Sequence, residues 1–242
     1  MVTMTLQDTN APRAGHRFEP THELTLHDAA ISACEVLPGA HRGVLIVREM
    51  VGPIGIPDMT ALVGDPENME ARMLLDVPPI LNQVDAAIVA SMSDKKPRST
   101  EMISEALKWP IGTIVRRLPN LVKIGAINTR GENRFVRPTS LHPTGRLYAI
   151  EAKVNDRVSA IHQARSYGSW ADSYVLVMGQ LGARPLQVLL DDVNYDRGGL
   201  IVDGQWMRRP VIRQHSVARR LWASEHFFAA IAQNSHQPSV RP

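Results

Sequence analysis

The segment Ile150-Glu151-Ala152-Lys153-Val154 constrains the fold more than any other part of the chain. Its apolar and charged residues alternate, and successive side chains of a β-strand point to opposite faces of a sheet. Ile150, Ala152 and Val154 are therefore expected to point into a core, while Glu151 and Lys153 share the other face. The apolar flanks indicate a strand inside the sheet rather than at its edge.

A second segment, Gly55-Ile56-Pro57-Asp58, lies about ninety residues earlier in the chain. If Asp58 belongs to a neighbouring strand, its carboxylate and that of Glu151 can hold one hard divalent cation, since such cations prefer oxygen ligands. Lys153 would then lie beside a water molecule that the cation activates. The simpler alternatives are an edge ion pair between Glu151 and Lys153, and an aspartate that only ends a turn.

Composition narrows the range of functions. The chain has 242 residues, 44% of them apolar, which is enough for one large domain or two small ones. Cys34 is the only cysteine, so one chain cannot build a disulfide framework or a thiolate zinc site. The sequence shows neither a signal peptide nor an apolar run of membrane-spanning length, and we expect a soluble, cytoplasmic protein with no membrane partner.

Familiar enzyme motifs are missing from the sequence. The nine histidines show no HxxxH or HExxH spacing, which argues against a zinc hydrolase. There is no GxSxG, GxxxxGK[ST] or GxGxxG segment either, so no nucleotide cofactor is expected.

The order of predicted elements indicates an α/β fold with a mixed sheet flanked by helices. A polar tail (residues 1–20) is expected to be flexible. A helix at 21–35 and a hairpin of strands at 43–50 and 57–63 follow. After residue 142 we expect a strand at 147–154, a helix at 158–170, a strand at 173–178, a short segment at 186–190, a hairpin at 199–207 and a helix at 217–233. On that last helix, Glu225 and His226 are expected to face solvent.

Residues 79–141 have a different pattern. Three helical stretches, a turn at Trp109-Pro110-Ile111-Gly112 and two short strands resemble a winged helix-turn-helix module. We therefore predict an insertion of residues 79–141 into a discontinuous core formed by 21–78 and 142–242.

Basic residues outnumber acidic ones in this module, which favours binding to the phosphates of double-stranded DNA. A winged helix used for protein contact or dimerisation is the alternative. The candidate DNA-binding residues are Lys95, Lys96, Arg98, Arg116, Arg117, Lys123, Arg130, Arg134 and Arg137.

Outside the module, the chain resembles the PD-(D/E)xK, or restriction-endonuclease-like, superfamily. The matching positions are Pro57-Asp58, Glu151-Ala152-Lys153 and the QxxxY pattern of Gln163 and Tyr167. The resemblance implies that Asp58, Glu151 and the Ala152 carbonyl bind Mg²⁺ or Mn²⁺ and that Lys153 positions the attacking water. Gln163 would line the site and Tyr167 would support it.

Two features depart from the family pattern. Asp58 and Glu151 are farther apart in sequence than is usual, which the inserted module explains. The family's acidic residue on the first helix has no clear counterpart; Glu35 is the better candidate metal ligand, and Glu23 is the other.

The resulting hypothesis is a Mg²⁺-dependent DNA nuclease with catalytic residues Asp58, Glu151, Lys153, Gln163 and Tyr167. Cutting of both DNA strands would favour a homodimer. The alternative is a non-enzymatic DNA-binding regulator on a nuclease-like scaffold. A second acid-x-Lys triplet, Asp94-Lys95-Lys96, lies in a polar loop without strand character and is interpreted as a chance occurrence.

Overall fold

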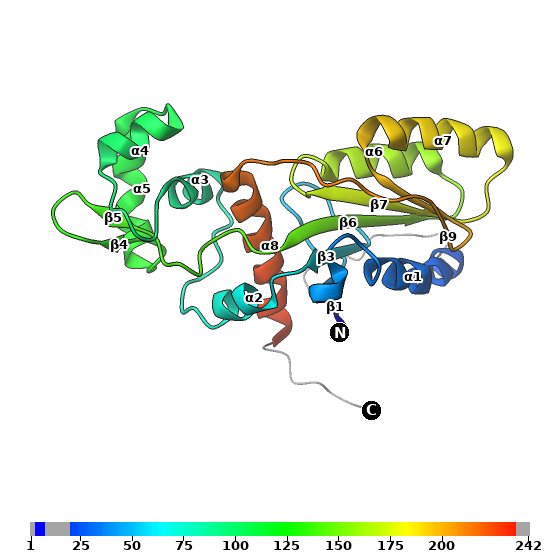
Figure 1. Cartoon of the computed structure of the whole chain (residues 1–242), viewed down its shortest axis with the longest axis horizontal. Helices are drawn as coiled ribbons and strands as arrows, with labels where there is room; N and C mark the ends of the chain where they lie inside the picture. Colours follow the sequence, from blue (N-terminus) through cyan, green and yellow to red (C-terminus); the bar gives the residue numbers. More distant parts are fainter. Residues whose placement is uncertain (1–2, 8–19, 236–242) are drawn as a thin grey trace. The chain divides into compact units, whose positions relative to one another are not determined.

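The computed structural model describes residues 3–7 and 20–235, with side chains described for residues 26–233 (Figure 1). Contacts divide the chain into two compact units. The first contains the segments up to residue 65, 145–214 and from residue 230. The second contains 66–144 and 215–229. No helix within the described ranges is long and apolar enough to cross a bilayer.

A seven-stranded mixed sheet organises the first unit. Its order is β1 (Thr3–Gln7), β2 (Val44–Arg48), β3 (Met59–Val63), β6 (Arg146–Lys153), β7 (Ser173–Met178), β8 (Gly199–Val202) and β9 (Gln205–Arg208). The pairs β1–β2, β6–β7 and β7–β8 are parallel, whereas β2–β3, β3–β6 and β8–β9 are antiparallel. The strand with the alternating charges, β6, lies at the centre of this order.

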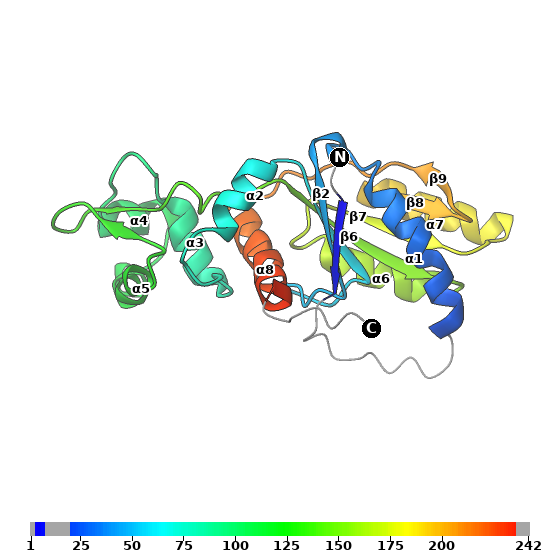
Figure 2. The same ribbon diagram turned by 90° about the horizontal axis from the view of Figure 1, so that it is seen from below.

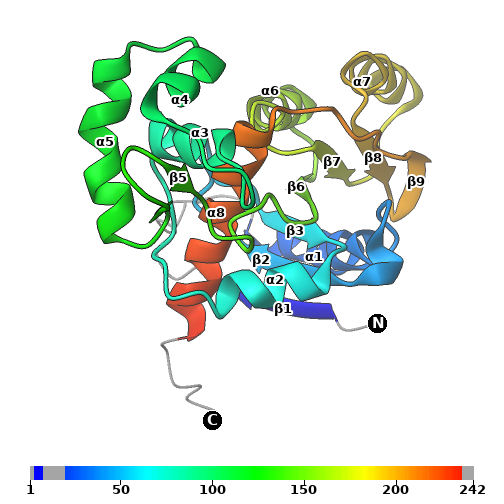
Figure 3. The same ribbon diagram turned by 60° about the vertical axis from the view of Figure 1, so that its left-hand side comes forward.

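Helices cover both faces of the sheet (Figure 3). Helix α1 (Pro20–Cys34) packs on the face formed by Ile46, Ala61, Ile150 and Val175. Helices α6 (Arg157–Tyr167) and α7 (Ala183–Asp196) pack on the other face against β7 and β8. The prediction of an α/β fold with a mixed sheet flanked by helices is confirmed.

Two elements of the first unit differ from the prediction. Thr3–Gln7 forms the edge strand β1 beside β2 (Figure 2), so the predicted flexible tail is wrong for these residues. Threonines alternating with Met4 and Leu6 suit a strand, but the partner strand is forty residues away, and such non-local pairing leaves no local signal. Helix α7 replaces the predicted short segment at 186–190. Its Pro185 lies in the first helical turn, where no intrahelical N–H bond is lost.

The second unit is mainly helical. It contains α2 (Pro66–Met73), α3 (Gln83–Ser91), α4 (Thr100–Leu107), α5 (Ile111–Lys123), the hairpin strands β4 (Asn128–Thr129) and β5 (Phe135–Val136), and the first part of α8 (Val217–Ser235). Asn82 and Ser99 cap α3 and α4 by accepting bonds from backbone N–H groups. Helix α5 begins inside the predicted turn, at Ile111.

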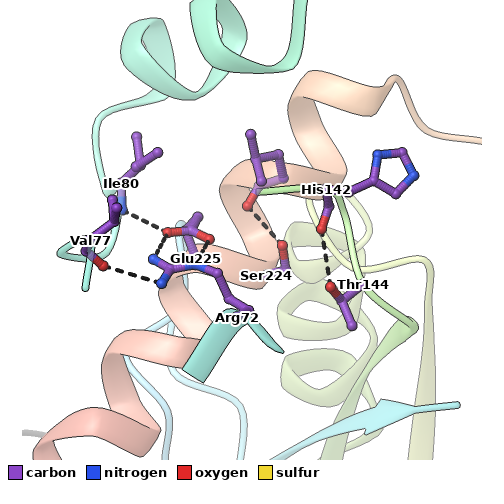
Figure 4. Close-up of polar contacts among 8 residues, drawn as sticks. Arg72, Val77, Ile80, His142, Thr144, Ser224 and Glu225 are labelled. Carbon is purple, nitrogen blue, oxygen red and sulfur yellow. Dashed lines mark hydrogen bonds and ion pairs between the residues drawn. The ribbon is translucent and has the colours of Figure 1, made fainter. Parts of the chain in front are cut away.

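A buried ion pair joins α2 to α8 (Figure 4). Arg72 Nε and Nη2 donate to the two carboxylate oxygens of Glu225 at 2.7 and 2.6 Å. Glu225 also accepts from the Ile80 N–H, and Arg72 donates to the Val77 carbonyl. Glu225 is 1% exposed, so its expected position on a solvated face is wrong.

The compact unit that contains this contact is larger than the predicted module of residues 79–141. The compact unit includes residues 66–78 and 215–229, which the prediction assigned to the core. Leu221 packs in the same hydrophobic cluster as Ile88, Ile103 and Leu118. The first half of α8 therefore completes the interior of a unit that begins 150 residues earlier in the chain.

Candidate active site

Asp58 lies where the β2–β3 loop enters β3. The loop closes as a hairpin, because the Glu49 N–H donates to the Asp58 carbonyl at 3.0 Å. The Asp58 carboxylate accepts from the Ala152 N–H at 2.7 Å. Residue 58 is thereby joined to the last residues of β6, although the two segments are far apart in sequence.

Glu151 and Lys153 share one face of β6, as their spacing predicts. Ile150 and Ala152 pack in the α1-side core, while the neighbours of Glu151 and Lys153 on β7, Leu176 and Met178, pack on the α6 side. Lys153 Nζ lies 3.2 Å from Glu151 Oε1. Glu151 is 2% exposed and Lys153 is 8% exposed, so this pair is not a solvated edge contact.

Tyr167 connects helix α6 to Glu151 and to the loop that precedes Asp58. Its hydroxyl is 2.9 Å from Glu151 Oε2, to which it donates, and 3.2 Å from the Ile56 carbonyl oxygen. Ile56 precedes Asp58 by two residues, so one side chain fixes a carboxylate on β6 and the loop that carries Asp58.

Trp170, which the sequence analysis did not include, holds the same loop. Its indole N–H donates to the Ile54 carbonyl at 2.9 Å. The loop approaches closely because it has glycines here. A Cβ on Gly52 would lie 2.9 Å from the Trp170 ring, and one on Gly55 would lie 2.8 Å from the Tyr167 ring. No local sequence pattern links this loop to the end of α6, which is why the sequence analysis missed the contact.

Two carboxyl groups and one amine share the site. Burial, and after it the neighbouring Asp58 carboxylate, raise the pKa of Glu151 to about 8, while Lys153 and the Tyr167 hydroxyl act in the opposite direction. Burial and Glu151 also raise the pKa of Tyr167, which keeps its hydroxyl protonated as a donor. When both carboxyl groups are ionised, they and the single ammonium leave a net negative charge in a poorly solvated place, which a bound cation would offset.

The donor set suits one cation. The carboxylates of Asp58 and Glu151 are adjacent, and the pairing of β3 with β6 ends at Ile150. Because the N–H and C=O of a strand residue point to the same edge, the Ala152 carbonyl faces the Asp58 side, as its N–H does. Within the described part of the chain, however, no group of three or more His, Cys, Asp or Glu side chains gathers at one point. Any cation here would depend on two carboxylates, a carbonyl and water.

The remaining predicted site residues lie elsewhere. Gln163 is one turn before Tyr167, and its amide oxygen accepts from Ser159 at 3.3 Å, so its described contact is along its own helix. Glu35 is exposed just after α1. The following Pro38 carbonyl accepts from Tyr148, three residues before Glu151. The structure does not bring Glu35 to the acidic pair, and the side chain of Glu23 lies outside the described residues.

The nine basic candidates of the second unit fall into two groups. Arg117 pairs with Asp85 at 2.8 Å. Arg137 donates to the carbonyls of Met92 and Leu141, and burial lowers its pKa. Arg98 pairs its backbone with Phe135 and is half-buried. The exposed ones are Lys95, Lys96, Arg116, Lys123, Arg130 and Arg134.

Asn120 was missed by the sequence analysis. It is exposed on α5, four residues after Arg116 and three before Lys123. Residues at these spacings share one face of a helix, so all three side chains lie together on the solvent side. The helical spacing alone could have identified it.

Comparisons with known proteins found no match. No protein-family model, curated protein or solved structure matches this chain. The interpretation of both units therefore depends on their own geometry.

Proposed function

We propose that this chain is a divalent-cation-dependent deoxyribonuclease of the PD-(D/E)xK type, with a winged-helix module that binds duplex DNA. The observation that carries the proposal is the convergence of Asp58, Glu151 and Lys153. The carboxyl groups of Asp58 and Glu151 and the amine of Lys153, which come from two separate segments, lie together near the end of β6.

The order and direction of the elements support the family resemblance. Helix α1 precedes an antiparallel series of β2, β3 and β6, and α6 then leads to β7, which is parallel to β6. The acid-x-Lys strand is the third strand of this series, and the tyrosine of the QxxxY helix contacts its glutamate.

The residues have separable roles in this proposal. Asp58, Glu151 and the Ala152 carbonyl would hold Mg²⁺ or Mn²⁺. When bound, the ion would polarise a phosphate oxygen and lower the pKa of a water ligand. Lys153 Nζ would donate to the attacking water or to a phosphate oxygen and offset the charge that develops there. Tyr167 holds the Glu151 carboxylate in place, and Trp170 positions the loop that ends at Asp58.

The second unit supports the DNA-binding part. Within it, α3, α4 and α5 followed by the β4–β5 hairpin resemble the element order of a winged helix. On α5, exposed Arg116, Asn120 and Lys123 combine two phosphate-binding cations with an amide that can pair with a base edge. Arg130 and Arg134 lie on the hairpin loop.

The module leaves the sheet at the end opposite the acidic residues. It follows Val63 of β3 and returns before Arg146 of β6, and these two residues pair with each other. Asp58 is five residues from Val63, which corresponds to roughly 17 Å along a strand. The two connections to the module therefore join β3 and β6 at the end away from Asp58 and Glu151.

Cleavage of plasmid DNA in Mg²⁺ tests the proposal. We expect Asp58→Ala and Lys153→Ala to reduce cutting at least about a hundredfold, since each removes a group that acts in the transition state. The matched control is Asp94→Ala, which alters the other acid-x-Lys triplet. Cutting by the Asp58→Ala protein at the wild-type rate would contradict the assignment.

DNA affinity should separate from cleavage. The Asp58→Ala protein should bind duplex DNA as wild type does. Arg116→Ala combined with Lys123→Ala should weaken binding and make it less sensitive to salt, because fewer phosphates are neutralised. Unchanged affinity and salt dependence of this double variant would exclude α5 as the DNA-binding surface.

A non-enzymatic DNA-binding protein is the second candidate. The observation that favours it is that Glu151 is already bound by Lys153 and Tyr167, without a third acidic residue beside it in the described chain. Specific DNA binding by a wild-type protein that cuts no linear, nicked, branched or single-stranded substrate in Mg²⁺ or Mn²⁺ would support this function.

A further inference from the structure

The second unit contains a cavity of about 490 Å³. It lies between the start of α3, the end of α4 and the start of α8, and all of its lining residues belong to this unit. Val84 and Leu107 form part of an apolar wall. The cavity is separate from the acidic residues of β6 and from the exposed face of α5.

Small side chains create this space. Each of the three helices contributes an alanine to the lining: Ala87 from α3, Ala106 from α4 and Ala218 from α8. The space is open to solvent, because Gln83, Ala106, Ser216 and Arg219 of its lining are exposed, whereas Ala87 is buried. Its volume falls within the range of roughly 300 to 1,000 Å³ that small-molecule sites occupy.

Trp109 supplies a planar wall. Its backbone is fixed to the end of α4, because the Trp109 N–H donates to the Ser104 carbonyl at 3.1 Å and the Ser104 hydroxyl donates to the Trp109 carbonyl at 2.6 Å. The ring is half-buried and lines the cavity. A held indole ring loses little freedom when it packs against a flat ligand.

The rim is positively charged. Arg219 is exposed at the cavity, and its Nη1 lies 3.2 Å from His215 Nδ1, which can accept from it when the ring is neutral. No described carboxylate forms an ion pair with Arg219. Of the acidic residues that flank the lining segments, Asp85 is paired with Arg117 at 2.8 Å, and Glu105 is exposed on α4. The amide of Gln83 adds a neutral polar group to the lining.

We propose that this cavity binds a small organic anion with a flat apolar body. The carboxylate or phosphate of the ligand would pair with Arg219, whose guanidinium suits two parallel hydrogen bonds to such a group. The apolar body would lie between Trp109 and the wall formed by Val84 and Leu107. The combination of an apolar wall, an aromatic face and a cation without a carboxylate partner among the described residues selects this chemistry over that of a neutral apolar ligand.

A matched pair of probes tests the charge requirement. The full-length protein is titrated with 2-naphthoate and with the neutral 2-naphthamide, and binding is followed by calorimetry. The indole N–H signal of Trp109, assigned with Trp109→Phe, locates the ligand by NMR. We expect saturable binding of the naphthoate with a dissociation constant of about 1 mM, in keeping with its size. The amide should bind at least about tenfold more weakly.

Two variants at exposed positions and one control complete the test. Arg219→Gln should weaken naphthoate binding about tenfold and leave the amide unaffected. Ala106→Trp should fill the cavity and abolish binding of both probes, whereas Arg116→Gln, outside the cavity, should change neither. Three results would overturn the proposal: no saturable naphthoate binding, equal binding of both probes, or a self-association that Ala106→Trp removes, which would make a second copy of the chain the occupant.

Discussion

Among individual residues, Glu151 has an electrostatically unfavourable environment for an ionised carboxyl group. It is almost fully buried, beside another carboxylate, and is held by one ammonium and one hydroxyl. Burial of a carboxyl favours its neutral form, so Glu151 takes up a proton more readily in the folded chain than in the unfolded one. A carboxylate kept in such a place makes structural sense when a cation shares the site.

The raised pKa of Glu151 makes stability depend on pH. Because folding raises this pKa from 4.5 to about 8, the stabilising contribution is fully present below 4.5 and is lost as the pH rises through 8. Glu151→Gln removes the ionisation. In the presence of a chelator, the free energy of unfolding of this variant, relative to that of wild type, should therefore increase as the pH rises from 4.5 to about 8. Denaturant titrations at both ends of the interval measure the difference, and parallel pH curves would contradict it.

At the element scale, the β2–β3 loop is positioned by the end of α6. Gly55 has a φ of +76° and lies against the Tyr167 ring. Gly55→Ala should lower the free energy of unfolding by about 1–3 kcal/mol, because the new Cβ is strained and displaces the ring. Gly112→Ala is the control: a Cβ there meets nothing within 4 Å, so stability should stay unchanged or rise by up to about 1 kcal/mol. Similar losses in both variants, seen in chemical denaturation, would refute the close approach.

The ion pair between α2 and α8 gives a second prediction at this scale. Glu225→Ala leaves the Arg72 guanidinium buried without its carboxylate and should cost about 3–5 kcal/mol of unfolding free energy. Replacing both partners, as Arg72→Met with Glu225→Leu, should recover most of that loss.

The control for this pair is the half-exposed ion pair of Arg117 and Asp85. Asp85→Ala should cost no more than about 1 kcal/mol. Denaturant unfolding measures all of these variants. A cost of Glu225→Ala no larger than that of Asp85→Ala would show that the buried pair does not hold α8 in place.

The periodicity of the sequence correctly predicted part of the structure. Alternation in β6 predicted that Glu151 and Lys153 share a face opposite Ile150 and Ala152, and the cluster memberships agree. The predicted antiparallel pairing of the second and third strands is also present. These features depend on a strand's own pattern and on a short connection, which is why they can be read locally.

Features that depend on distant partners were missed. Trp170 contacts a loop 116 residues earlier in the chain, and neither segment has a pattern that names the other. Glu225 lies four residues after Leu221 and three before Phe228, on an apolar face of α8. Its charge led to the prediction that it faces solvent, but its ion pair with buried Arg72, 153 residues away in sequence, places it in the interior.

At the scale of the whole molecule, the two units are assembled from discontinuous segments. The second unit consists of residues 66–144, between β3 and β6, and of residues 215–229, which include the first part of α8. The remaining part of α8, from Ala230, belongs to the first unit. The chain therefore passes between the units four times, so neither can be excised as one continuous segment.

For the whole molecule, the proposed activity requires that the acidic residues of the first unit bind a metal ion. Anomalous scattering from crystals of the full-length protein soaked in Mn²⁺ tests it most directly. The account predicts one strong peak within bonding distance of Asp58 and Glu151, near the Ala152 carbonyl, and no such peak in the Asp58→Ala protein. Well-ordered crystals in which Lys153 and Tyr167 still bind Glu151, with no Mn²⁺ beside Asp58, would contradict it.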